Sequence, residues 1–353
     1  MALALAALSP FAAAAPTSPA GDVAHLVRAA EAALAGGDVD GAHRALERAA
    51  NLEHSAETEL RQLRAAMQMG EYERALALAA HVAGAHLDSP APSVLYSWLL
   101  FIGGQRDIAR RLLADVSVRF PEHALVAAAR DQLRSPAPLA TGPLLEAPGR
   151  IAPYGKSVPF RARVVASAVL IDQGRRALAP LAAILPGSRL WVRNGLGTLT
   201  AAAIERRLPA SGLLVLRLQH PLRTGTPVAI APAAAFPGSI AHAVEYVTSA
   251  DATPRWPLLS SGFIGDVDGA RRALGIDLAA GPRGGPVFDA GGRLVGIAVR
   301  ESGWDRLVPP SRLPADIGAM LGATDAAGRA APVPLSRIYE SALFSTLQVI
   351  VSR

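Results

Sequence analysis

Few residues of this chain combine the types and spacing that catalysis requires. The chain has no cysteine, which excludes thiolate nucleophiles, disulfides and zinc–thiolate sites. His81 and His86 are five residues apart, whereas two metal ligands on one helical face are usually four apart. Ser239 lies near His242, and Ser260-Ser261-Gly262 predicts a turn, but neither arrangement aims a serine at a base. We expect these serines to be surface residues, and we expect no metal site and no cofactor.

A glycine-rich segment is the most informative part of the sequence about function. Residues 281–289 are Gly-Pro-Arg-Gly-Gly-Pro-Val-Phe-Asp, and residues 291–297 are Gly-Gly-Arg-Leu-Val-Gly-Ile. This segment strongly resembles the nucleophile region of bacterial trypsin-like serine peptidases of the Deg, or high-temperature-requirement, type. That family has Gly-Asn-Ser-Gly-Gly-Pro, then a hairpin turn and a strand ending in Val-Gly-Ile.

The resemblance implies an oxyanion loop formed by Gly281, Arg283, Gly284 and Gly285. Glycines suit such a loop because the backbone must bend tightly to present two main-chain N–H groups to the oxyanion. The serine position is occupied by Arg283. Arginine has no attacking oxygen, so the resemblance excludes acyl-enzyme chemistry at this position.

The two other triad positions are also empty by the same resemblance. Residues 169–172 and 177–184 resemble the family's histidine motif and place Ala182 at the base, with Ala183 as the near alternative. Residues 209–218 resemble the aspartate strand and place Gly212, or Ser211, at the acid. The resemblance covers roughly residues 160–318, so it implies a whole trypsin-like double-barrel domain with a degenerate triad.

The charge pattern argues against nucleic-acid partners. The net charge is +6, but Lys156 is the only lysine and the arginines are scattered, without a basic stripe. Residues 149–157 look like a phosphate-binding loop, but five residues separate the glycines where four are needed, and Pro153 removes a backbone donor. We expect peptide or protein partners instead.

The N-terminal part shows helical periodicity with an internal repeat. Gly37, Gly70 and Gly104 recur at intervals of 33 and 34 residues, each followed five residues later by an alanine. Each glycine can end a first helix in the left-handed conformation, and the alanine lets the second helix approach closely. Each second helix then carries two further apolar positions: Leu46 and Ala49, Ala79 and Val82, Leu113 and Val116. The pattern resembles the tetratricopeptide repeat (TPR).

Such a solenoid would present a concave face lined by its first helices. Counting back from each glycine gives the peptide-binding candidates Leu60, Arg64, Met67, Trp98 and Phe101, together with Val27 and Glu31. The alternative is that Trp98 and Phe101 are core residues, because apolar side chains surround that helix on nearly all sides.

The domain organisation follows from these patterns. We predict a signal-like or disordered leader over 1–21, three TPR-like repeats with a capping helix over 22–135, a Pro- and Gly-rich linker over 136–157, the trypsin-like domain over 158–322, and a helix–strand tail over 323–353. The fold class is α + β multidomain: an α-solenoid followed by an all-β double barrel, since the later strands are short and closely spaced.

Both ends of the chain leave alternatives. The Ala-rich start resembles a secretory signal and favours a periplasmic or secreted protein, although no basic residue precedes the apolar run; a plain disordered leader and a cytoplasmic location are the alternative. No later run is apolar enough to span a membrane. The C-terminal strand either completes the first barrel or begins a second peptidase module.

Three functional hypotheses remain from the sequence. The first is a catalytically inactive trypsin-like homologue that binds or scaffolds peptides or proteins, with Arg283 either pairing with a partner's carboxylate or simply solvated. The second is an active serine endopeptidase with a non-standard nucleophile. The third is a TPR adaptor with a passive barrel.

Overall fold

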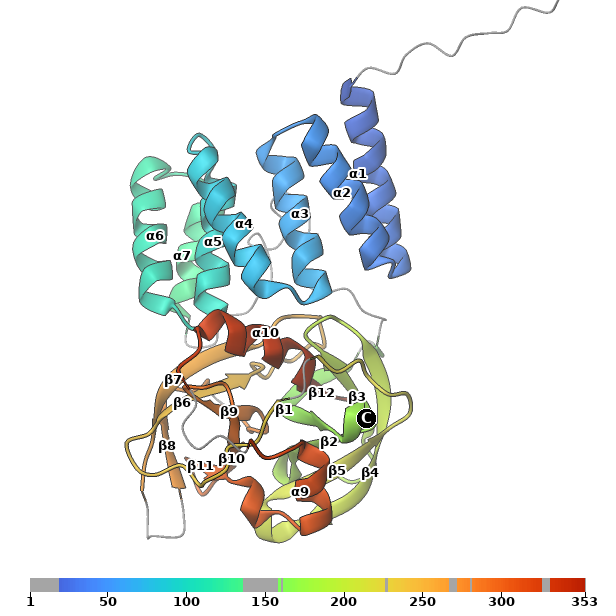
Figure 1. Ribbon diagram of the computed structural model, residues 1–353, viewed down its shortest axis with the longest axis vertical. Coiled ribbons are helices and arrows are strands. Elements are labelled where there is room, and N and C mark those ends of the chain that lie inside the picture. Colours follow the sequence, from blue (N-terminus) through green and yellow to red (C-terminus); the bar gives the residue numbers. More distant parts are fainter. Residues whose placement is uncertain are drawn as a thin grey trace, which may run out of the picture.

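The computed structural model describes residues 19–135, 158–159, 161–225, 228–266, 272–279, 281–325 and 331–352. A layer of helices lies on one side of two β-barrels, with the C-terminal helix between them (Figure 1). The predicted linker and most of the predicted leader lie outside the described residues.

The helical part consists of antiparallel helices packed in sequence order. They are α1 (Pro19–Gly36), α2 (Val39–Leu52), α3 (Ala56–Met69), α4 (Tyr72–Ala85), α5 (Pro90–Ile102), α6 (Arg106–Arg119) and α7 (Ala124–Arg134). Gly37, Gly70 and Gly104 have φ values of 82°, 83° and 88°, so the predicted left-handed turns are present. The predicted stripe on α2, α4 and α6 is buried: its six residues are at most 3 % exposed. The helical repeat is therefore confirmed.

The β part forms two closed six-stranded barrels. The first has the order β1-β12-β3-β4-β5-β2, formed by β1 (Arg163–Ile171), β2 (Arg176–Pro180), β3 (Arg189–Asn194), β4 (Leu199–Leu208), β5 (Leu213–Leu218) and β12 (Thr346–Ser352). The second has the order β10-β11-β8-β7-β6-β9, formed by β6 (Ile240–Glu245), β7 (Leu258–Ile264), β8 (Arg272–Ile276), β9 (Pro286–Asp289), β10 (Leu294–Glu301) and β11 (Trp304–Val308). The predicted all-β double barrel is confirmed.

The C-terminal strand β12 belongs to the first barrel. It pairs antiparallel with β1 on one side and with β3 on the other. Of the two arrangements that the sequence left open for the tail, the structure has the one in which this strand completes the barrel. Every residue of β12 is buried, as expected for a strand between two neighbours that also faces α10 (Leu335–Ser345).

The helices and the barrels share one hydrophobic core. The ring centroids of Tyr72 on α4 and Tyr339 on α10 are 4.5 Å apart. The Tyr339 hydroxyl donates to the Pro257 carbonyl, just before β7 of the second barrel, at 2.7 Å. Glu73 N donates to the Glu340 carboxylate at 2.8 Å. On α6, Arg106 Nη2 donates to Ser260 Oγ of β7 at 2.6 Å. The helical part is thus packed on the barrels both through α10 and through direct contacts with β7.

A separate apolar core joins the two barrels. Ile171 and Val215 of the first barrel pack with Ile297 and Val299 of the second, beneath α9 (Ala315–Leu321). Because the loop at 281–285 leads into β9 at this junction, the candidate site lies where the barrels meet.

Candidate functional site

The loop at residues 281–285 is packed tightly between the barrels. Gly281 and Gly284 have φ values of 123° and 127°, which a side chain rarely tolerates. A Cβ on Gly284 would stand 2.0 Å from the Ser167 carbonyl oxygen and 2.5 Å from Pro180 Cδ. A Cβ on Gly285 would stand 2.3 Å from the Val244 carbonyl oxygen. Close approach of neighbouring backbone therefore requires these two glycines.

The segments that carry the three positions assigned to the triad by the resemblance meet in space. Leu181 N, next to Ala182, donates to the Gly212 carbonyl at 2.9 Å. Pro180 in turn lies against Gly284. Neither Ala182, which is exposed, nor Gly212 has a group that can accept a proton. The meeting point therefore provides no general base from these positions.

Arg283 is buried, and its side chain points toward β6 and β11 of the second barrel. Its side chain is 1 % exposed. Nε and Nη2 donate to Asp305 Oδ1 and Oδ2 at 2.8 Å each, a bidentate pair with a residue of β11. Nη1 donates to the Ala279 carbonyl and lies 3.7 Å from Glu245 Oε2. Both roles predicted for Arg283, pairing with a partner's carboxylate and exposure to solvent, are wrong, because internal carboxylates already hold the guanidinium.

Two carboxylates with opposite pKa shifts surround Arg283. Burial raises the pKa of Glu245, on β6, to about 7, although the Arg283 charge and a hydrogen bond from Gly285 N (3.3 Å) act against this. Burial also acts to raise the pKa of Asp305, but hydrogen bonds from Arg283 and Arg300 outweigh it and lower that pKa. Arg300 donates to both Asp305 oxygens, at 3.0 and 3.2 Å. We call Arg283, Glu245, Asp305 and Arg300 the Arg283 cluster.

Neither carboxylate of this cluster was a site candidate from the sequence. Glu245 ends β6 between the apolar residues Val244 and Tyr246, which is a usable signal for a buried ionisable group. Asp305 gives no comparable signal, because it follows a hairpin in a segment of mixed polarity. Only the pairing of β10 with β11 and the course of the loop bring it to Arg283.

One serine does lie beside a histidine, at a place the sequence did not indicate. His242 on β6 is directly opposite Ser261 on β7, and His242 Nδ1 is 2.8 Å from Ser261 Oγ. Burial lowers the pKa of His242, while the nearby Asp289 acts to raise it. Ser260 instead accepts a hydrogen bond from Arg106. The predicted turn at 260–262 is wrong, because these residues lie within β7.

The peptide-binding candidates of the helical part do not line a groove. Exposed fractions are 2 % for Leu60, 4 % for Arg64, 0 % for Met67, 0 % for Trp98 and 3 % for Phe101. Trp98 and Phe101 stack with ring centroids 5.9 Å apart inside the shared core. The prediction is wrong at these five positions because the first helices are covered by neighbouring helices and by the second barrel, and the core alternative for Trp98 and Phe101 is the one present. Among the described residues, no group of three His, Asp or Glu side chains is placed to hold a metal.

The fold is a helical repeat joined to two closed six-stranded β-barrels, which is the architecture that the resemblance to trypsin-like peptidases implied. No protein-family model and no curated protein matches the chain. Among solved structures, the chain is similar to the apo MamO protease domain from Magnetospirillum magneticum: 22% identity, TM-score 0.33, covering 44% of this chain and 89% of that one.

It is also similar to the Rv3671c protease from M. tuberculosis. For the active form the identity is 16% and the TM-score 0.35, over 48% of this chain and 83% of that one. For the inactive form the identity is 13% and the TM-score 0.35, over 45% and 87% of the two chains.

Proposed function

We propose that this chain is a non-hydrolytic protein with a trypsin-like fold, which binds or scaffolds peptides or proteins. The observation that carries the proposal is the side chain of Arg283. At the position that the resemblance assigns to the nucleophile, it presents a guanidinium that is turned inward and paired with Asp305 through two 2.8 Å hydrogen bonds. A group held in this way neither attacks a carbonyl nor leaves space for a substrate side chain where the guanidinium lies.

The loss of the two other catalytic groups supports the same proposal. Ala182 and Gly212 occur where the resemblance places the base and the acid, and their segments meet beside Gly284. The glycines of the loop are tightly packed, although the chain has no nucleophile or base at the positions that would work with an oxyanion hole. A fold that keeps its close packing but has no proton acceptor at these positions fits a binding role better than catalysis.

The helical part and the barrel act together in this proposal. The adaptor hypothesis, in which the barrel is passive, predicts separable halves. Tyr72, Tyr339 and Trp98 instead belong to one core with residues of the second barrel such as Leu259 and Phe288. Cutting the chain between the halves would expose that core, so the binding unit we propose is the whole chain.

The His242–Ser261 pair favours one alternative function, a serine hydrolase with a non-standard nucleophile. A serine within hydrogen-bond reach of a histidine has the geometry of an activated nucleophile. Ser261 is exposed on β7, whereas His242 is only 7 % exposed. This pair gives the alternative a specific residue to test.

The test is hydrolysis of casein and of a mixed peptide library by the full chain, read by mass spectrometry. We expect no cleavage by the unaltered protein or by Ser261→Ala. Cleavage that disappears in Ser261→Ala, but persists in the matched Ser239→Ala control, would establish the hydrolase and overturn the proposal.

Location is a further part of the proposal. We propose export, on the basis of the Ala-rich leader, and no helix among the described residues is long and apolar enough to cross a membrane. Fusion of residues 1–30 to a reporter enzyme that is active only after export would test this. Activity of the fusion supports export, and an inactive reporter retained in the cytoplasm contradicts it.

A further inference from the structure

A hollow is present whose lining does not include Ala182, Gly212 or Arg283. It is a cavity of about 580 Å³ between the barrels, α9 and α10. Its wall is largely apolar, and includes Val169 and Ile171 of β1, Phe288 of β9, Met320 and Leu321 of α9, and Phe344 of α10. This volume and lining are typical of a site for one small ligand.

The cavity has an exposed cation beside it. The guanidinium of Arg223 lies 5.9 Å from the centre of the Phe344 ring, whose atoms line the cavity. The next residues, Thr224 and Gly225, are also part of the lining. A Cβ on Gly225 would stand 2.8 Å from the Phe344 ring, so the chain after Arg223 runs directly over this ring. Within the described part of the chain, Arg223 has no carboxylate partner.

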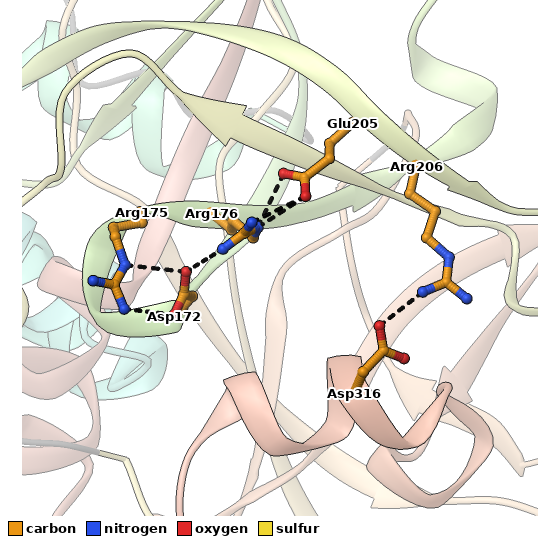
Figure 2. A network of polar contacts seen from close by, with 6 residues as sticks. All are labelled: Asp172, Arg175, Arg176, Glu205, Arg206 and Asp316. Carbon is orange, nitrogen blue, oxygen red and sulfur yellow. Dashed lines mark hydrogen bonds and ion pairs between the residues drawn. The ribbon is translucent and has the colours of Figure 1, made fainter.

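Among the described residues that line the cavity, the one acidic group is already neutralised. Asp172 accepts hydrogen bonds from Arg175 and Arg176, and Arg176 is also paired with Glu205 (Figure 2). Hydrogen bonds from Arg175, together with those from Arg176, lower the pKa of Asp172 despite some desolvation. Because Asp172 is held by these two arginines, the lining offers no free negative charge to oppose an anion.

The helix that covers the cavity is fixed in place. Arg206 of β4 donates to Asp316 of α9 at 2.8 Å, an ion pair that ties this short helix to the first barrel (Figure 2). Ile317, on the same helix, is buried in the core between the barrels. The apolar cavity is therefore a formed feature of the fold rather than a gap beneath a loose segment.

We propose that this cavity binds a single-chain aliphatic carboxylate, with the tail inside and the carboxylate on Arg223. The apolar lining favours an alkyl chain over a peptide, whose backbone amides would each need a hydrogen-bond partner. The exposed guanidinium supplies the charge-assisted bond for the head group, and Thr224 is placed beside it. The proposal does not depend on whether the barrel hydrolyses anything.

Calorimetric titration of the full chain with octanoate, decanoate and dodecanoate, below their micellar concentrations, tests this. We expect affinity to rise about fourfold for each added methylene until the tail fills the cavity. Arg223→Gln should weaken dodecanoate binding by about tenfold and leave dodecanol binding unchanged. The matched control Arg207→Gln, at an exposed position outside the lining, should change neither.

Filling the cavity should abolish binding of both ligands. Ala319→Trp on α9 and Ser341→Phe on α10 each add bulk at a lining position, on separate helices, so one variant serves if the other unfolds. The proposal is overturned if dodecanoate binds either variant, in its folded form, as well as it binds the unaltered chain. It is also overturned if affinity does not depend on chain length, or if peptides ending in apolar residues bind in an Arg223-dependent way and dodecanoate does not.

Discussion

Replacing Arg283 by serine should destabilise the protein without creating a peptidase. The side chain is 1 % exposed and gives two charge-assisted hydrogen bonds to Asp305 at 2.8 Å each. Breaking a buried ion pair by removing one partner typically costs about 3–5 kcal/mol, because the remaining charge stays buried. Here Asp305 keeps Arg300 at 3.0 and 3.2 Å. We therefore expect a loss near the lower limit, about 3 kcal/mol in the free energy of unfolding.

The assay is urea unfolding of the full chain, followed by tryptophan fluorescence. The matched control is Arg300→Ser, which removes the other cationic partner of Asp305 from a side chain that is 38% exposed. This control should cost less than about 1 kcal/mol, since solvent screens an exposed pair. If Arg283→Ser costs no more than Arg300→Ser, the guanidinium does not hold the loop as we describe.

Three further predictions concern the same packing. Because burial raises the pKa of Glu245 to about 7, the folded state holds a proton that the unfolded state has released, so the free energy of unfolding should fall as pH rises from about 4.5 to about 7. Urea titrations at several pH values should show a smaller fall for Glu245→Gln than for the unaltered protein. Equal falls in the two proteins would contradict this. Gly284→Ala, whose Cβ would stand 2.0 Å from the Ser167 carbonyl oxygen, should lower the free energy of unfolding by about 3 kcal/mol. The control Gly187→Ala, at a position that also has a positive φ but open space around it, should lower it by about 1 kcal/mol. Equal losses for the two variants in thermal unfolding would refute the packing argument. Tyr339→Phe should lower the free energy of unfolding by about 1 kcal/mol, because it removes the hydrogen bond to the Pro257 carbonyl, and it should speed amide hydrogen exchange in α10. An unchanged exchange rate in α10 would contradict a shared core.

The fold was largely predictable because it depends on patterns that repeat along the chain. The glycines at 37, 70 and 104 and the apolar stripes predicted the helical hairpins, and short apolar runs predicted the barrel strands. The exposure of particular first-helix residues was not predictable. Whether Leu60, Met67 and Trp98 face a groove or a core depends on how α10 and the second barrel pack against the helices, which periodicity does not contain.

The sequence assigned the candidate site a position but could not predict the surroundings of its side chains. The sequence alone aligned Arg283 with a nucleophile, but its burial depends on Asp305 and Glu245, which come from β11 and β6. The His242–Ser261 contact likewise depends on the register of β6 with β7, and a shift of one residue would turn the two side chains to opposite faces. Long-range register is the information that local sequence patterns lack.

The central proposal is that the protein is non-hydrolytic, and it requires that the His242–Ser261 pair holds no activated nucleophile. The most direct measurement is the intact mass of the full protein after treatment with a fluorophosphonate, with a Ser261→Ala variant in parallel. We predict that the mass of both proteins stays unchanged. A single adduct on the unaltered protein that is missing from Ser261→Ala would contradict the claim and assign hydrolytic chemistry to the His242–Ser261 pair.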